Sequence, residues 1–178
     1  MDGHSPQPKS GGKPPHSIIF AICACVVFTV WGALRLAPDA FVVPVFCRVP
    51  AGLAAGYYNA PLETPEMIFN ARGTDFEVAR ACGATDFFSM LAGLFTYLCL
   101  KRRSVWLGLA VLPLAWCAVV AVNTLRVILL VPGRVMIYHF LPERAHVAGH
   151  QAVGTFIFLT SFILIWEGVR HATRKPPR

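Results

Sequence analysis

Hydrophobic residues gather into four blocks along the chain, each long enough to cross a membrane. The blocks span residues 17–37, 85–101, 104–131 and 147–169. A transmembrane helix needs about 20 mostly apolar residues to cross a hydrocarbon core of about 30 Å. The pattern therefore predicts an all-α integral membrane protein with about four transmembrane helices.

A fifth apolar stretch, residues 41–58, is interrupted by two prolines, Pro44 and Pro50, and by a charge, Arg48. These interruptions make it too broken for a span. It ends in two tyrosines, and aromatic side chains suit the boundary between membrane and water. We expect an interfacial or re-entrant helix lying on the membrane, where Arg48 reaches the lipid headgroups.

The connection between the first and second spans, residues 38–84, is long for so small a protein. After Pro61, apolar and polar residues alternate in "MIFNA" and again in "DFEVARA", and "RGT" separates the two runs. Alternation with a period of two is typical of strands, and Gly73 suits the turn between them. We expect a small β-hairpin on the outer membrane face that leads to Cys82, at the head of the second span. Loops of this length are more often functional than bare connectors.

Composition supports the membrane assignment. Hydrophobic residues make up 56% of the chain and charged residues 14%, against about 45–50% and about 25% in soluble domains. The first block is longer than the apolar core of a signal peptide, and no clear small-residue cleavage site follows it. We therefore expect the first block to be a retained span.

Basic residues flank the spans unevenly and predict the topology. They precede the first span, join the second to the third as "KRR", and follow the fourth, whereas the other two connections carry mixed charge. The positive-inside rule places both termini and the "KRR" loop in the cytoplasm, and the loop 38–84 outside a cytoplasmic (inner) membrane. Residues 1–16 are expected to be a disordered cytoplasmic N-terminus and residues 170–178 a basic cytoplasmic tail. The net charge of +7 is thus a topology signal, and nucleic-acid binding is not indicated.

Four polar residues fall at one depth once this topology is adopted. Cys82 precedes the second span, Asn123 and Arg126 lie near the outer end of the third, and His150 lies near the outer start of the fourth. A membrane-embedded arginine usually faces a partner or a wet cavity, and residues three apart share a helical face. Each residue alone also has a structural interpretation, as a snorkelling arginine, a bonded asparagine or a packing histidine.

Together these residues fit nucleophilic catalysis. A cysteine attacks as the thiolate, whose pKa falls when a cation lies near. Histidine can take the thiol proton and return it to a leaving amine. Arginine can stabilise the thiolate or the oxyanion formed at the attacked carbonyl. The set suffices for acyl transfer if the fold brings its members together.

Metal binding is the rival chemistry. His146 and His150 are four apart, on one helical face, with His139 and Glu143 upstream. No acidic residue follows His146 as in "HExxH", so the metal signal is weak and no metal or cofactor is expected. Asp86 is interpreted as an acidic residue at a helix N-terminus or as a partner for an arginine.

The remaining cysteines give little information. Four of the six lie inside predicted spans, where a thiol behaves as a small apolar residue. Only Cys47 and Cys82 are expected near the outer surface. A disulfide between them is therefore the alternative to chemistry at Cys82.

In this order the motifs resemble the exosortase/archaeosortase family of membrane cysteine transpeptidases. The resemblance rests on Cys82 in "ACGATDFF", on Asn123 and Arg126 in "NTLR", and on His150 and Gly154 in "HQAVG". It covers most of the chain and implies that residues 17–169 form the transmembrane catalytic domain. Gly83 follows the cysteine at once, whereas family members often have glycine one place later. The small number of spans is similar to the short forms sometimes labelled exosortase K.

The resemblance implies a catalytic triad of Cys82, Arg126 and His150. Four further residues would support it: Asn123, Gly83, Gly154 and Asp86. The implied partner in the lipid bilayer is a secreted protein with a C-terminal signal made of a short motif, a transmembrane helix and a basic tail. The alternative is a small membrane assembly or transport subunit in which Arg126 and His150 pair structurally with Asp86 or Glu143.

Overall fold

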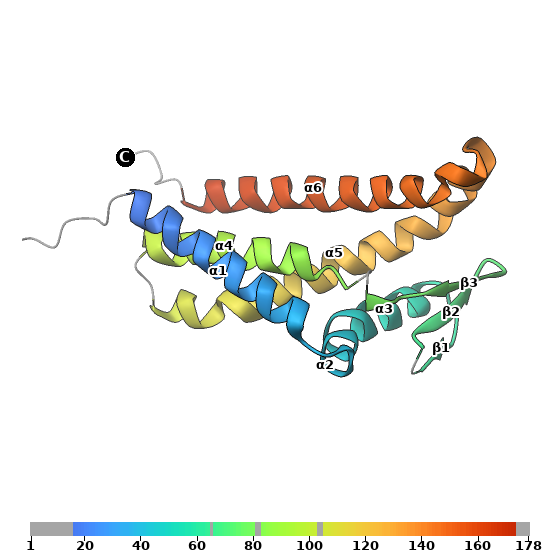
Figure 1. Cartoon of the computed structure of the whole chain (residues 1–178), viewed down its shortest axis with the longest axis horizontal. Coiled ribbons are helices and arrows are strands. Elements are labelled where there is room, and N and C mark those ends of the chain that lie inside the picture. The colour runs from blue at the N-terminus through green and yellow to red at the C-terminus, as the bar shows by residue number, and fades with distance from the viewer. Residues whose placement is uncertain (1–15, 65, 81–82, 103–104, 174–178) are drawn as a thin grey trace, which may run out of the picture.

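A computed structural model describes residues 16–64, 66–80, 83–102 and 105–173 of the 178-residue chain. Four long helices form an elongated bundle (Figure 1): α1 (His16–Leu36), α4 (Thr85–Arg102), α5 (Val105–Phe140) and α6 (His146–Thr173). Helix α4 packs against the other three. The start of α1, the end of α6 and the junction of α4 with α5 lie at one end of the bundle. The predicted fold class, an all-α membrane protein with a small sheet, is confirmed.

Four helical segments are long and apolar enough to cross a membrane. They are His16–Leu36, Asp39–Tyr57, Gly108–Phe140 and Glu143–His171. The second of these is the stretch expected to be interfacial. Helix α4 coincides closely with the predicted second span, but it carries charges at both ends and is lined with buried side chains. By length and composition, α4 is not among the four segments that could cross a membrane.

The segment with two prolines is helical throughout, as expected, but the expectation that it is too broken for a span is wrong, because by length and composition it could cross a membrane. It comprises α2 (Asp39–Val43), a π-helical turn (Pro44–Arg48) and α3 (Val49–Tyr57). Because Pro50 has no N–H, it cannot donate to Val45 O, five residues earlier in the π-helical pattern. The indole Nε1 of Trp116 on α5 donates to that carbonyl instead, at 3.0 Å. A side chain of another helix thus supports the turn.

The predicted hairpin is present. Strands β2 (Ile68–Ala71) and β3 (Thr74–Glu77) pair antiparallel, with Phe69 opposite Phe76. Gly73 has φ +77° in the turn between them, a conformation that glycine adopts without steric cost. A short strand, β1 (Leu62–Glu63), adds a third member next to β2, which the sequence pattern did not predict.

Helix α5 is longer than the sequence suggests. The third span was expected to end at 131, just before Pro132, yet the helix continues to Phe140. Pro132 cannot donate the usual bond to Ile128 O. The hydroxyl of Tyr58 donates to that carbonyl at 2.8 Å, so the helix passes the proline with its carbonyl bonded. A short 3-10 turn (Glu143–Ala145) then leads into α6.

Two clusters of buried side chains hold the chain on either side of residues 81–82. One packs the sheet and α3 against α5 and includes Cys47 and Val78. The other packs α2, α4 and α5 together and includes Phe46 and Ala84. Val78 and Ala84, on either side of residues 81–82, therefore belong to different cores.

Candidate active site

Cys82, the predicted nucleophile, lies outside the described residues, but the residues around it are placed. The backbone N–H of Gly83 donates to Arg80 O at 2.9 Å, which closes a turn between these two residues. A Cβ at position 83 would lie 3.1 Å from Arg80 O and 3.3 Å from the Cys47 sulfur. Glycine therefore fits this position because a side chain would crowd the turn. Any separation between Cys82 and Cys47, Arg126 or His150 also falls outside the described residues.

Helix α4 begins immediately after this turn. Ala84 has φ +52°, and its carbonyl accepts the N–H of Phe88 at 2.9 Å, which starts the helical ladder. Asp86 lies in the first turn of α4, where a carboxylate is favoured by the helix dipole. Its carboxylate accepts a hydrogen bond from Trp31 Nε1 at 2.9 Å and pairs with Arg35 at 3.4 Å. Asp86 is thus both an acid at a helix N-terminus and a partner for an arginine.

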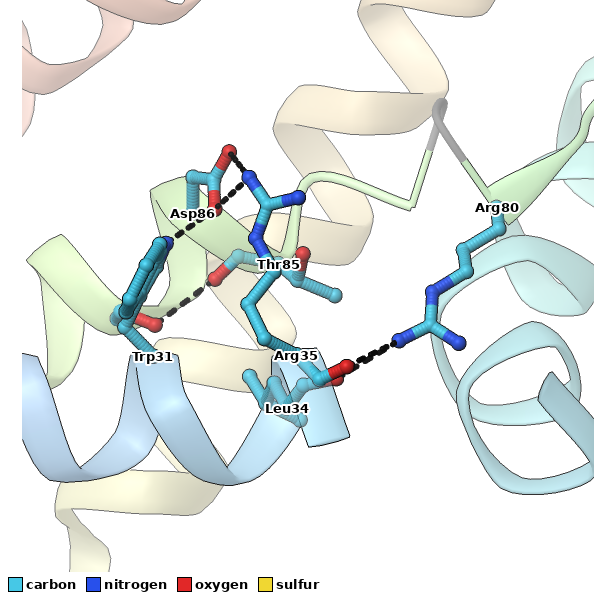
Figure 2. A network of polar contacts seen from close by, with 7 residues as sticks. Trp31, Leu34, Arg35, Arg80, Thr85 and Asp86 are labelled. Atoms are coloured by element: carbon cyan, nitrogen blue, oxygen red, sulfur yellow. Dashed lines mark hydrogen bonds and ion pairs between the residues drawn. The ribbon is translucent and has the colours of Figure 1, made fainter. Parts of the chain in front are cut away.

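Arg80, just before the turn, contacts the C-terminal end of α1, the helix that also carries Trp31 and Arg35. Its guanidinium donates to the carbonyl oxygens of Leu34 at 3.0 Å, Arg35 at 3.2 Å and Ala37 at 3.0 Å. It also forms an ion pair with Asp39. Figure 2 shows Arg80 and Asp86 approaching the C-terminal end of α1 from two sides.

Arg126 lies between α5 and α6. Its guanidinium carbon is 4.9 Å from the centre of the Phe158 ring, a cation–π arrangement. A Cβ at Gly154 would lie 2.7 Å from its Nε and 3.1 Å from a terminal nitrogen. Only a glycine lets the planar group lie this close to α6. The buried Nε has no hydrogen-bond partner among the described residues, so Arg126 is held by packing.

A cavity of about 640 Å³ joins these groups. Three cationic side chains and one carboxylate face it, together with apolar and hydroxyl groups. The lining residues are Arg35, Arg80, Ala84, Thr85, Asp86, Phe87, Arg126, Gln151, Gly154, Thr155 and Phe158. One cavity is therefore bordered both by residues on either side of positions 81–82 and by the arginine of the "NTLR" motif.

His150 lies one turn before Gly154 on α6, so its Cα is about 6 Å closer to the N-terminus of the helix. Its ring is 6.3 Å from that of Tyr138, edge to face. It is not among the described residues that line the cavity. Asn123 is completely buried on α5, one turn before Arg126. The structure thus brings Arg126, Gly154, Gly83 and Asp86 to one region, with His150 near its edge.

The family model for transmembrane exosortases matches residues 51–167. The chain belongs to this family. The matched range includes "ACGATDFF", "NTLR" and "HQAVG", and it begins after α1 and α2. No curated protein and no solved structure matches the chain. Exosortase membership supports a multi-pass membrane protein that processes sorting signals.

The residues considered for a metal site lie where α5 leads into α6. Within the described ranges, no three His, Cys, Asp or Glu side chains gather closely enough to hold a metal ion. The Nε2 atom of His146 lies 3.0 Å from Leu141 O, and its ring packs 4.1 Å from the Tyr138 ring. His146 is therefore engaged in the turn that joins α5 to α6.

Sequence reasoning missed several residues of this region. Arg35, Arg80 and Phe158 line the cavity, and Trp31 binds Asp86, but none was singled out. The only signals in the sequence were two isolated arginines: Arg80, two residues before Cys82, and Arg35, near the end of the first apolar block. Neither position reveals its partner, because the contacts join segments more than 40 residues apart.

Proposed function

We propose that this exosortase family member is a membrane cysteine peptidase or transpeptidase. It cleaves the C-terminal sorting signals of secreted proteins at the outer face of the cytoplasmic membrane. The observation that carries the proposal is the contact between Arg126 and Gly154 beside the 640 Å³ cavity. It joins the "NTLR" and "HQAVG" motifs physically, at the place where the chain leaves Cys82 and enters α4.

Cys82 is the nucleophile in this mechanism. Its thiolate attacks the carbonyl carbon of the scissile peptide, and the tetrahedral intermediate collapses with cleavage of the C–N bond. The product is a thioester on Cys82, and the amine leaves with a proton. Water or an acceptor amine then attacks the thioester and releases the thiolate. No cofactor is needed for either half of the reaction.

Arg126 and His150 have different roles. Arg126 borders the cavity and presents a planar cation that stabilises the oxyanion or the thiolate. His150 takes the thiol proton and gives it to the leaving amine. Asn123, one turn before Arg126, and Gly154 support the arginine. Asp86 acts indirectly, because its carboxylate is engaged by Trp31 and Arg35.

The topology that suits this reaction places both termini in the cytoplasm. The start of α1, the end of α6 and the junction of α4 with α5 lie at one end of the bundle, and basic residues flank all three. Under the positive-inside rule this end is cytoplasmic. The cavity near the opposite end then faces outward, toward secreted substrates.

Replacement of Cys82 tests the proposal. Cys82→Ala should abolish cleavage of a co-expressed candidate substrate with a C-terminal motif, helix and basic tail, and should also abolish a hydroxylamine-sensitive acyl-enzyme. Cys23→Ala and Cys117→Ala, which remove thiols from α1 and α5, are the matched controls and should retain both. Undiminished cleavage by Cys82→Ala would rule out the thiol as nucleophile.

The alternative, a membrane assembly subunit, also has one observation in its favour. Arg126 packs over Phe158 and against Gly154, which is what an arginine that only joins two helices would do. In that case Cys82→Ala would leave function intact, whereas Arg126→Ala would reduce the amount of folded protein. The cysteine variant therefore separates the two functions.

A further inference from the structure

The C-terminal end of α1 contacts the chain on both sides of the candidate nucleophile. Arg80 is two residues before Cys82, and Asp86 is four residues after it. Both side chains reach the last two turns of the same helix, from opposite sides (Figure 2). Because the Gly83 N–H to Arg80 O bond closes the turn between them, the turn and the end of α1 form one connected unit.

Arg80 caps α1. The last carbonyl groups of a helix have no N–H partner within it, and a guanidinium offers five donors in a plane. Arg80 uses them on three carbonyls at the end of α1, those of Leu34, Arg35 and Ala37. One side chain thus fixes both the direction of α1 and the position of the residue that opens the turn.

Asp86 completes the attachment from the other side. Trp31 Nε1 and the Arg35 guanidinium both bind its carboxylate, and the Arg35 guanidinium also lies 5.4 Å from the Trp31 ring. Three of these groups, Arg35, Arg80 and Asp86, line the candidate cavity. The end of α1 is therefore part of the wall that Arg126 faces.

Helix α1 otherwise has the properties of a plain anchor. None of its residues is buried, and it lies outside the 51–167 range that matches the family. A helix that only anchors the chain would need no polar contacts, yet the last two turns of α1 make several of them. They converge on the residues around Cys82.

We propose that the C-terminal end of α1 is a working part of the active site, with Arg80 and Asp86 as positioning residues for the nucleophile. This inference rests on the proposed function, since it takes Cys82 as the reacting thiol. The contacts are solvent-exposed: the Arg35 and Asp86 side chains are 59% and 62% accessible. Exposed ion pairs contribute little to stability, so their removal should change the geometry of the site more than the fold.

Three variants test the inference: Arg80→Gln, Asp86→Asn and Trp31→Phe, the last of which deletes a single donor. Arg170→Gln is the control, since it breaks an exposed pair with Glu167 on α6, near the end of that helix. Two quantities are measured per folded molecule. One is the rate of substrate cleavage, split into kcat and KM. The other is the rate and pH profile of Cys82 alkylation by a membrane-impermeant iodoacetamide, followed at that peptide by mass spectrometry.

Misplacement of a reacting group by about 1 Å can cost about 100-fold in rate. Arg80→Gln and Asp86→Asn should therefore lower kcat by about 10-fold to 100-fold with little change in KM, and both should alter the alkylation profile. Trp31→Phe should act in the same direction but less strongly. Arg170→Gln should match the unmodified protein in both measurements.

The outcomes separate the two proposals. If Cys82→Ala still cleaves substrate, the proposed function fails, whereas the alkylation profiles still report whether α1 positions this turn. If Cys82→Ala is inactive but the folded positioning variants cleave and alkylate like Arg170→Gln, the role of α1 is wrong. Should Arg80→Gln fail to fold, Asp86→Asn and Trp31→Phe decide the question.

Discussion

The guanidinium of Arg126 lies against the bare backbone of Gly154, so closely that a Cβ there would come within 2.7 Å of its Nε. The two residues are 28 positions apart in the sequence and belong to different motifs. Their contact explains why a glycine follows the histidine of "HQAVG" by one turn. The glycine makes room for the arginine of α5 beside the cavity, four residues from His150.

Gly154→Ala should displace Arg126 from its place. The added methyl group cannot coexist with the guanidinium, and overpacking typically costs about 1–3 kcal/mol. We expect cleavage to fall by about 10-fold to 100-fold, since small misplacements of reacting groups are costly. Gly168→Ala, on the same helix with open space at its Cβ, is the control. Equal activity of the two variants would show that the Arg126–Gly154 contact has no catalytic role.

Arg126→Lys should be nearly inactive. Lysine keeps the positive charge but not the planar fork of donors, and loss of one donor to an oxyanion costs about 100-fold to 1,000-fold in kcat. The measurement is the rate of substrate cleavage at equal amounts of folded protein. Arg48→Lys, at an exposed arginine of the π-helical turn, should retain activity. Wild-type rates for Arg126→Lys would count against oxyanion stabilisation.

Tyr58→Phe should destabilise the C-terminal part of α5. It removes the donor to Ile128 O, which Pro132 cannot replace, and an unsatisfied buried carbonyl costs about 1–3 kcal/mol. The free energy of unfolding should fall by this amount, and hydrogen exchange should accelerate at residues 133–140. Tyr57→Phe, at a side chain that is 65% exposed, should change neither quantity. A stable, protected helix in Tyr58→Phe would mean that the hydroxyl is not needed.

The sequence was sufficient for the broad fold, because membrane spans and hairpins depend on local patterns. Runs of apolar residues predict long helices wherever they lie, and the alternation around Gly73 predicted the hairpin. Helix ends near prolines were harder to predict. Pro132 indicates a helix end locally, and only the Tyr58 hydroxyl, 70 residues away in the sequence, allows α5 to continue.

The candidate site was predictable in part for the same reason. "NTLR" has a spacing that places Asn123 and Arg126 on one helical face, so both could be selected from the sequence, whereas Gly154 follows from the family resemblance. No such spacing in the sequence predicts the contacts of Arg80 and Asp86 with α1. They depend on how α1 packs against α4, with Val27 close to Gly93, and packing between distant segments leaves no periodic trace in the sequence.

The length of α5 places the proposed site at a defined distance from the other end of the helix. Its 36 residues extend about 54 Å, well beyond a hydrocarbon core of about 30 Å. If Val105 marks the inner boundary, Arg126 lies about 32 Å along the helix, where lipid tails give way to headgroups. The remainder of α5 then extends beyond this length, with the sheet packed on it. Under the proposed function, the peptide bond that is cut lies where the substrate emerges from the lipid, so its distance from the substrate's membrane anchor selects the cleavage site.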